Sequence, residues 1–398
     1  MSENHSTSTM YRILLSISIV HLLNDSMQAA IPAILPILKD NLLLSYFQLG
    51  VILFINNVTA SLLQPVIGYF SDRMPRPFLL PLSMCFSGLG MLGIAFANSY
   101  TFVLLSVSLV GIGSAFFHPE ASRVAHMASG PRRGLGQSIF QVGGNAGSAL
   151  GPLMTAWIFL PFGQSSASLF TLTAATAFVV LFLVSRWYKK AQRSKKAIAQ
   201  AVQLAFARKR YIALILLIII VSVRSWLYAG FQSFYPLFLI DVQHLPRVDA
   251  QFHTFIFLLA GAIGTVFGGP LADRFGKRTM ILLSTLGALP VTMLIPYVSG
   301  MWTYPLLFLD GLILLSCFSV TVVYAQELLP GRIGTVSGLI IGLSFGMGGI
   351  GAAMLGRLAD LQGLTFVIVL CSVMPLIGVL GFFLPKDETI ESWEKVAA

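Results

Sequence analysis

The sequence predicts an all-α integral membrane protein with about twelve transmembrane helices, arranged as two six-helix bundles. Its 398 residues are 56% hydrophobic and only 10% charged, whereas a soluble domain carries roughly 25% charged residues. The apolar residues gather in windows of about 20, the length that crosses the hydrocarbon core of a bilayer as a helix. These windows are continuous and rich in Leu, Ile, Phe and Gly, which excludes the ten-residue alternation of a transmembrane β-barrel.

The expected helices are the apolar windows between polar breaks. In the first half they cover residues 11–38, 46–70, 78–97, 101–122, 136–160 and 167–185. In the second half they cover residues 211–239, 252–272, 279–298, 302–325, 333–356 and 364–384. The first window is too long for the core of a cleaved signal peptide and lacks a small-residue cleavage site, so we expect it to be a retained helix.

A basic segment separates the two halves. Residues 186–210 contain nine Lys or Arg and no acidic residue, and basic segments are held on the cytoplasmic side of a membrane. This favours a cytoplasmic linker over a nucleic-acid arm. It predicts a bundle at 1–185, a linker at 186–210, and a bundle with a short cytoplasmic tail at 211–398. With both termini cytoplasmic, 21 of the 25 basic residues fall in inside segments, so topology explains the net charge of +10.

A short loop motif occurs once in each half, which indicates a duplicated architecture. The core Gly-x-x-x-Asp-Arg recurs 201 residues later, and a second, weaker echo near positions 133 and 332 has nearly the same offset. Each copy lies at the cytoplasmic end of an expected helix, where a carboxylate can also meet a helix N-terminus. The motif residues are Gly68, Asp72, Arg73 and Arg76 in the first copy, and Gly269, Asp273, Arg274, Gly276, Lys277 and Arg278 in the second.

These motifs resemble the loop signature of the major facilitator superfamily, complete at 269–278 and degraded at 68–77, where Pro75 and Pro77 depart from it. Strings such as His21-Leu-Leu-Asn-Asp25 and Phe117-His-Pro-Glu120 are similar to the bacterial fosmidomycin resistance protein family of drug exporters. The resemblance implies the major facilitator fold around a central cavity, with the loop motifs as a conformational latch. Fosmidomycin-like phosphonates are the candidate substrates. Val107 stands where drug–proton antiporters often carry Arg, so their coupling arrangement does not transfer directly.

Ionisable side chains inside a membrane span are costly and mark functional positions. Most of those here fall on the first, fourth, seventh and tenth expected helices, which the resemblance implies line the cavity. Asp25 lies about 21 Å along the first span and Arg224 about 20 Å along the seventh. The residues predicted to bind substrate or couple protons are His21, Asn24, Asp25, Gln28, His118, Glu120, Arg123, Gln141, Asn145, Arg224, Tyr228, Gln232 and Asp310.

Helical spacing groups these residues into faces. The positions from His21 to Gln28 share one face of the first span, and Gln141 and Asn145 belong to a polar stripe on the fifth. For that stripe, simple hydrogen bonding between helices remains an alternative. Arg224, Tyr228 and Gln232, with Phe231 and Tyr235 beside them, suit an amphipathic ligand. Asp25 and Arg224 also have an alternative: they pair with each other across the halves.

The sequence therefore predicts a proton-coupled efflux transporter of amphipathic or anionic small molecules, working by alternating access. We expect Asp25, with Glu120 as a second candidate, to take up a proton and release its hold on Arg224 or the ligand. The expected partners are a small-molecule substrate, protons and the lipid bilayer, with no nucleic acid, no cofactor besides the proton gradient and no metal. A monomer in the bacterial inner membrane is expected, and the odd count of three cysteines favours buried packing over disulfides.

Three other functions remain alternatives. A facilitator that imports a nutrient or exports a metabolite has the same sequence features, since direction depends on gradients. A membrane-embedded enzyme needs a nucleophile–base pair or a metal cluster, and no such cluster is evident, so we expect no enzyme. A passive channel is disfavoured by the duplicated halves and their loop motifs.

Overall fold

The computed structural model describes residues 9–44, 46–74, 76–195 and 206–397, and these separate into two compact units. Unit 1 comprises Met1–Pro131, Ile139–Val202 and Gly331–Gly342, and unit 2 comprises Arg132–Ser138, Gln203–Pro330 and Leu343–Ala398. Each unit thus contains one short helical piece from the other half of the chain. The middle of the predicted linker, residues 196–205, lies outside the described residues, and the predicted domain boundaries stay predictions.

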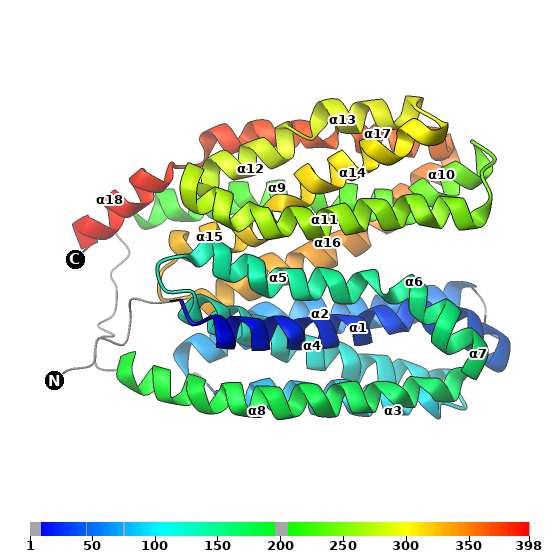
Figure 1. Cartoon of the computed structure of the whole chain (residues 1–398), viewed down its shortest axis with the longest axis horizontal. Helices are drawn as coiled ribbons and strands as arrows, with labels where there is room; N and C mark the ends of the chain where they lie inside the picture. Colours follow the sequence, from blue (N-terminus) through cyan, green and yellow to red (C-terminus); the bar gives the residue numbers. More distant parts are fainter. Residues whose placement is uncertain (1–8, 45, 75, 196–205, 398) are drawn as a thin grey trace. The chain divides into compact units, whose positions relative to one another are not determined.

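Unit 1 is built on long helices that run alongside one another (Figure 1). They are α1 (Tyr11–Leu42), α2 (Tyr46–Arg73), α3 (Leu79–Ala95), α4 (Tyr100–Ala128) and α8 (Leu169–Lys195). Helix α4 packs against α1, α2 and α3, and α8 packs against α1 and α3. At the start of α4 the Ser99 hydroxyl accepts a hydrogen bond from the backbone N–H of Phe102, the usual way to satisfy a helix N-terminus. The helices enclose a core that includes Leu14, Met27 and Phe117.

The fifth expected span is interrupted. It consists of α5 (Arg133–Ala149), α6 (Gly151–Met154), a π-helical turn η1 (Thr155–Phe159) and α7 (Leu160–Phe162), followed by the 3-10 turn η2 (Gln164–Ser168). Pro152 and Pro161 lie inside this stretch, and proline removes a helical hydrogen bond and clashes with the preceding turn. The interruption therefore has a local cause in the sequence.

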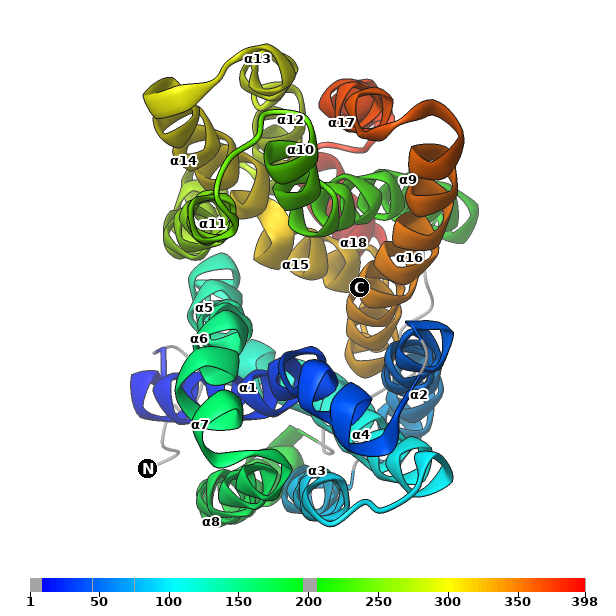
Figure 2. The ribbon, with the colours of Figure 1, turned by 90° about the vertical axis from the view of Figure 1, so that its right-hand side faces the viewer.

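Unit 2 contains more, shorter helices (Figure 2). They are α9 (Ala207–Ser233), α10 (Tyr235–Asp241), α11 (Arg247–Phe275), α12 (Lys277–Leu286), α13 (Leu289–Leu294), α14 (Thr303–Leu314), α15 (Phe318–Leu328), most of α16 (Ile333–Gln362), α17 (Leu364–Val373) and α18 (Asp387–Ala397). The 3-10 turns are η3 (Ile295–Tyr297), η4 (Gly300–Trp302), η5 (Leu315–Cys317) and η6 (Met374–Phe383). Proline stands near the start of α10, α13, η3 and η6, positions that proline tolerates well.

The described helices match the predicted spans. Ten are long and apolar enough to cross a membrane, and α3 is a shorter apolar helix. The remaining span is the interrupted one at residues 133–162. The prediction of an all-α membrane protein is confirmed. The prediction that all three cysteines are buried is wrong for Cys85, which is exposed on α3, while Cys317 and Cys371 are buried.

Candidate functional site

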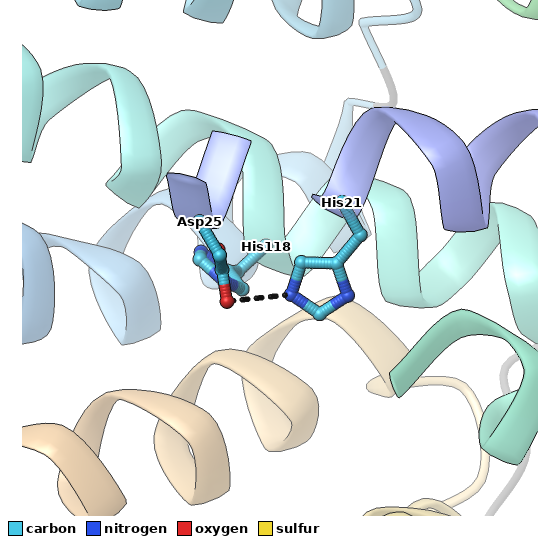
Figure 3. Close-up of side chains that lie close together, drawn as sticks. All are labelled: His21, Asp25 and His118. Atoms are coloured by element: carbon cyan, nitrogen blue, oxygen red, sulfur yellow. Dashed lines mark ion pairs between the residues drawn. The ribbon is translucent and has the colours of Figure 1, made fainter. Parts of the chain in front are cut away.

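Three ionisable side chains from α1 and α4 meet inside unit 1 (Figure 3). Asp25 is 4% exposed, His21 1% and His118 2%. One carboxylate oxygen of Asp25 lies 3.3 Å from Nε2 of His21, and the other lies 3.5 Å from Nε2 of His118. We call these three residues the His–Asp–His cluster.

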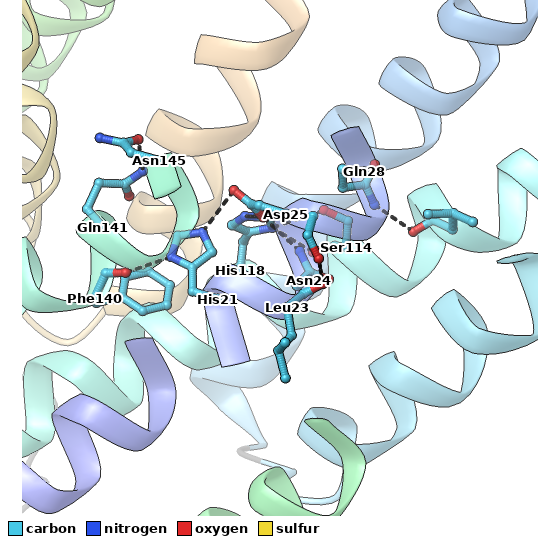
Figure 4. Close-up of polar contacts among 12 residues, drawn as sticks. His21, Leu23, Asn24, Asp25, Gln28, Ser114, His118, Phe140, Gln141 and Asn145 are labelled. Atoms are coloured by element: carbon cyan, nitrogen blue, oxygen red, sulfur yellow. Dashed lines mark hydrogen bonds and ion pairs between the residues drawn. The ribbon is translucent and has the colours of Figure 1, made fainter. Parts of the chain in front are cut away.

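Backbone carbonyls fix the orientation of both imidazoles (Figure 4). Nδ1 of His21 lies 2.8 Å from the carbonyl oxygen of Phe140, and its ring stacks on the Phe140 ring with centroids 4.1 Å apart. Nδ1 of His118 lies 2.9 Å from the carbonyl oxygen of Ser114, one turn earlier on α4. Because a carbonyl oxygen only accepts, each Nδ1 carries a hydrogen and each Nε2 faces the carboxylate.

This orientation allows the cluster to bind protons. A neutral imidazole with hydrogen on Nδ1 presents a lone pair at Nε2, and two such lone pairs would repel the Asp25 carboxylate. A proton on either Nε2 converts the repulsion into a charge-assisted hydrogen bond. The ligand-type atoms of the cluster lie within 4.8 Å of one another, a spacing that also suits a cation.

The predicted polar face of the first span is present around the cluster. Asn24 donates from Nδ2 to Asp25 at 2.9 Å. Gln28 instead ties α1 to its neighbours: it donates to the Val110 carbonyl on α4 at 3.1 Å and accepts from Asn56 on α2 at 3.1 Å. On α5, Gln141 donates to Asn145 at 3.3 Å (Figure 4). None of these distances joins the α5 pair to Asp25.

Glu120 and Arg123 have partners other than the cluster, although the sequence grouped them with Asp25. The fully buried Glu120 accepts hydrogen bonds from the Ser71 hydroxyl on α2 and from the Tyr188 hydroxyl on α8, the latter at 3.0 Å. Arg123 forms an ion pair with Asp72. The structure thus divides the polar residues of α4 between two groups. His118 belongs to the His–Asp–His cluster, and Glu120 and Arg123 belong to a second network.

The predicted ligand-binding face of α9 is only partly accessible in unit 2. Arg224 and Tyr228 are half-buried and Gln232 is exposed. Phe231 and Tyr235 are 2% and 1% exposed and belong to the hydrophobic core with Phe257. These two rings therefore pack in the interior of unit 2 in this conformation, and the use of this face for a ligand stays a prediction.

Asp310 on α14 is fully buried in unit 2. One of its oxygens lies 2.8 Å from the Thr292 hydroxyl on α13. That contact is within unit 2, so Asp310 has a local partner that the sequence did not single out.

The two loop-motif aspartates each cap a helix. Asp72 accepts from the backbone N–H groups of Gly334 and Thr335 at 2.9 and 2.7 Å, at the start of α16. Asp273 accepts from the N–H groups of Gly134 and Leu135, both at 3.0 Å, at the start of α5. A helix N-terminus carries unpaired N–H groups and partial positive charge, so a carboxylate is stabilised there. The expected meeting of each acid with a helix N-terminus is present.

The motif glycines allow these contacts. A Cβ on Gly68 would strike the backbone of Gly334, and a Cβ on Gly269 would strike the carbonyl of Gly134. Only glycine lets the helices approach this closely. The motif glycines therefore permit the close helix approach at which the motif aspartates bind the helix N-termini.

The basic members of the motif have different surroundings. Lys277 lies 3.1 Å from Glu327 and 3.2 Å from Asp387, and Arg278 donates to the carbonyls of Gly381 and Phe382. Arg73 lies over the Tyr69 ring, and Arg274 lies over the Phe275 ring. Arg76 is exposed, and Gly276 adopts a φ of 87° that favours glycine.

Sequence reasoning missed the partners of these residues. Ser71 and Tyr188 lie 49 and 68 residues from Glu120, and Glu327 and Asp387 are likewise far along the chain from Lys277. The signal for Asp387 was its place as the first acidic residue after the last apolar window.

The family model described as Major Facilitator Superfamily matches residues 17–353. The chain belongs to the Major Facilitator Superfamily. It is therefore a multi-pass membrane transporter, and the expectation from the loop motifs is confirmed. Members of this family are generally not enzymes and need no cofactor.

Two relatives match nearly the whole chain. An uncharacterised MFS-type transporter, YfnC, of Bacillus subtilis is 48% identical over 97% of this chain and 96% of its own. The fosmidomycin resistance protein of Escherichia coli is 47% identical over 95% of this chain and 94% of its own. The predicted resemblance to that protein's family is thus confirmed.

Solved structures confirm the fold. The human organic anion transporter MFSD10 matches with a TM-score of 0.76 at 16% identity, covering 95% of this chain and 100% of that one. The Escherichia coli fucose:proton symporter FucP matches with a TM-score of 0.71 at 13% identity, covering 94% and 98%. At these identities the likeness concerns the fold alone.

Proposed function

We propose that this transporter is a proton-coupled exporter of small amphipathic or anionic molecules, including antibiotics such as fosmidomycin, in the bacterial inner membrane. The similarity to the fosmidomycin resistance protein supports the choice of substrate class. The His–Asp–His cluster supports proton coupling and is the observation that carries the proposal. Basic segments that fall on one side support a topology with both termini in the cytoplasm. A monomer is sufficient for this function.

The proposed coupling site is the whole cluster rather than Asp25 alone. A first proton taken up by the cluster relieves the repulsion between the Asp25 carboxylate and the Nε2 lone pairs. A second proton gives both imidazoles a hydrogen bond to the carboxylate. Either step changes how tightly α1 is held to α4, since His21 and Asp25 lie on α1 and His118 on α4. A difference in proton affinity between two conformations is what lets a gradient drive a conformational cycle.

The latch contacts are proposed to set the rate of that cycle. Asp72 and Asp273 each bind the first turn of a helix from the other half of the chain. These contacts have to break and re-form whenever the transporter changes its open side. Arg224 is proposed to attract the anionic group of the substrate.

Transport by purified protein in proteoliposomes tests the proposal. Vesicles are loaded with fosmidomycin, a pH gradient is imposed, and drug movement is followed for wild type and for the Asp25→Asn and His118→Gln variants. We expect gradient-driven movement of the drug against protons in wild type, its loss in Asp25→Asn, and movement roughly tenfold slower in His118→Gln. His253→Gln is the matched control, because His253 is another buried histidine, 2% exposed and located on α11. Drug movement in wild type that does not depend on the pH gradient would contradict proton coupling. Drug movement in the same direction as the protons would favour an importer.

A further inference from the structure

The guanidinium of Arg224 is bound entirely by neutral groups. It donates to the thiol of Cys317 and the carbonyl of Leu314, and its Nη1 lies 3.5 Å from the hydroxyl oxygens of both Ser284 and Thr285. Among the described residues, no carboxylate forms an ion pair with it. A cation without a charged partner inside a membrane span is energetically costly, and such a residue marks a functional position.

These neutral partners are arranged so that an anion could replace them. The Ser284 and Thr285 hydroxyls lie 3.3 and 2.8 Å from the carbonyl of Ile281, so their hydrogens are engaged on α12 and their oxygens face the guanidinium. A rotation of each hydroxyl would turn it into a donor toward an oxyanion. Guanidinium forks bind phosphonate and carboxylate oxygens in pairs, and such charge-assisted bonds are stronger than bonds to neutral acceptors.

Arg224 also donates a hydrogen bond to the backbone where the tenth span changes from α-helix to a 3-10 turn. That span is α14, the 3-10 turn η5 and α15. The N–H of Phe318 bonds to the carbonyl of Leu315, three residues back, whereas in an α-helix it would bond to Leu314, four residues back. The Leu314 carbonyl is left with acceptor capacity that Arg224 uses. A 3-10 stretch in the middle of a helix often marks a hinge.

Arg224 is the least buried member of this group of contacting residues. Arg224, Tyr228 and Gln232 are spaced four residues apart on one face of α9. The first two are half-buried and the third is exposed. The guanidinium is thus not sealed off, although Cys317 and Thr285 beside it are fully buried.

We propose that Arg224, Ser284 and Thr285 form a subsite for the oxyanion of the exported molecule, a phosphonate or similar group, and that its binding frees the hinge at η5. The oxyanion draws the guanidinium away from Leu314 and Cys317, so the tenth span can straighten or bend at its 3-10 turn. This proposal rests on the proposed export function and names the chemistry by which unit 2 recognises the substrate.

Cys317 is a native reporter for the proposal. The chain has three cysteines, so a Cys85→Ser/Cys371→Ser background leaves Cys317 as the sole thiol. The rate of its alkylation by N-ethylmaleimide is measured with and without fosmidomycin. Its uncharged phosphonate diester serves as the control ligand. Loss of one charge-assisted hydrogen bond changes an equilibrium constant by roughly tenfold. We therefore expect fosmidomycin to raise the rate of Cys317 labelling about tenfold and the diester to leave that rate unchanged.

Variants separate the anion site from general effects. Arg224→Gln in the same background should abolish the response to fosmidomycin. Arg224→Lys, which keeps the charge but not the fork, should leave a weakened response if the glutamine variant does not fold. Arg357→Gln, an exposed arginine on α16, should respond like the parent.

The outcomes distinguish this subsite from the export function. Labelling that fosmidomycin leaves unchanged or slows, in protein that exports the drug, overturns the subsite and leaves export standing. Labelling that accelerates in protein that does not exchange the drug for protons supports the subsite and counts against the exporter. An equal response in the Arg224→Gln variant also overturns the proposal.

Discussion

Asp72 on α2 accepts a hydrogen bond from the backbone N–H of Thr335, which lies 263 residues further along the chain at the start of α16. Asp273 makes the equivalent contact with Leu135 at the start of α5. The two contacts differ: Asp72 also accepts from the Thr335 hydroxyl and pairs with Arg123, whereas no ion pair to Asp273 occurs among the described residues. The first latch therefore has a charged support on α4 that the second lacks.

This difference predicts that the second latch is the more sensitive to loss of its charge. In Asp273→Asn the carboxylate no longer interacts with the partial positive charge of α5, an effect of about 0.3–1 kcal/mol. We expect the transport rate to change while the affinity for substrate stays close to wild type. Initial rates over a range of substrate concentrations in proteoliposomes measure both quantities. Asp249→Asn, at an exposed residue in the first turn of α11, is the control, and an unaltered rate in Asp273→Asn would refute the latch.

Gly269→Ala tests the close approach of the helices that carry that latch. The new Cβ would strike the Gly134 carbonyl, and overpacking of this kind costs about 1–3 kcal/mol. We expect transport to slow by roughly fivefold or more, with a normal amount of protein in the membrane. Gly349→Ala is the matched control, because a Cβ there meets nothing within 4 Å. Equal rates for the two alanine variants would show that the helices do not need this approach.

Tyr188→Phe tests whether Glu120 belongs to the substrate site. The change removes the 3.0 Å hydrogen bond to the buried Glu120, which should lower the free energy of unfolding by about 1–3 kcal/mol. Because this bond does not involve the His–Asp–His cluster, we expect the affinity for substrate to remain unchanged. Thermal unfolding and ligand titration of the purified protein give the two values. Tyr297→Phe, at a residue 74% exposed, should alter neither, and a large loss of affinity in Tyr188→Phe would place Glu120 in the substrate site after all.

The sequence predicted the helices well because their signal is local. A window of about 20 apolar residues is needed at each crossing, and charge asymmetry predicts which side of the membrane each connecting loop faces. The fifth span shows the limit of this reasoning. Its apolar window, 136–160, is continuous in hydropathy, but with Pro152 inside it and Pro161 directly after it the span is broken into helices and a π-turn.

The candidate site was predictable only in part. Helical spacing placed His21 and Asp25 on one face of α1, but it could not show that His118 of α4 would meet them. The sequence offered Glu120 as a second candidate for proton uptake after Asp25, and side-chain packing joins it to Ser71 and Tyr188. Contacts between distant segments depend on how helices rotate about their axes, and hydropathy does not determine that rotation.

Replacing either histidine should weaken the cluster in a defined way. In His21→Gln the carboxylate of Asp25 keeps only one imidazole, so the cluster holds fewer protons at a given pH. We expect gradient-driven export to fall by roughly tenfold, the effect of losing one hydrogen bond to a charged group. A pH series of export rates for the two single variants, His21→Gln and His118→Gln, measures this. Rates that match wild type at every pH would remove the histidines from the coupling site.

Proton release on substrate binding tests the coupling site most directly. Purified transporter in weakly buffered detergent solution is mixed with fosmidomycin while a pH indicator follows the solution, for wild type, Asp25→Asn and His253→Gln. From the proposed coupling site we expect that wild type and His253→Gln release protons on binding and that Asp25→Asn binds the drug without releasing any. Equal proton release from Asp25→Asn and wild type would contradict it.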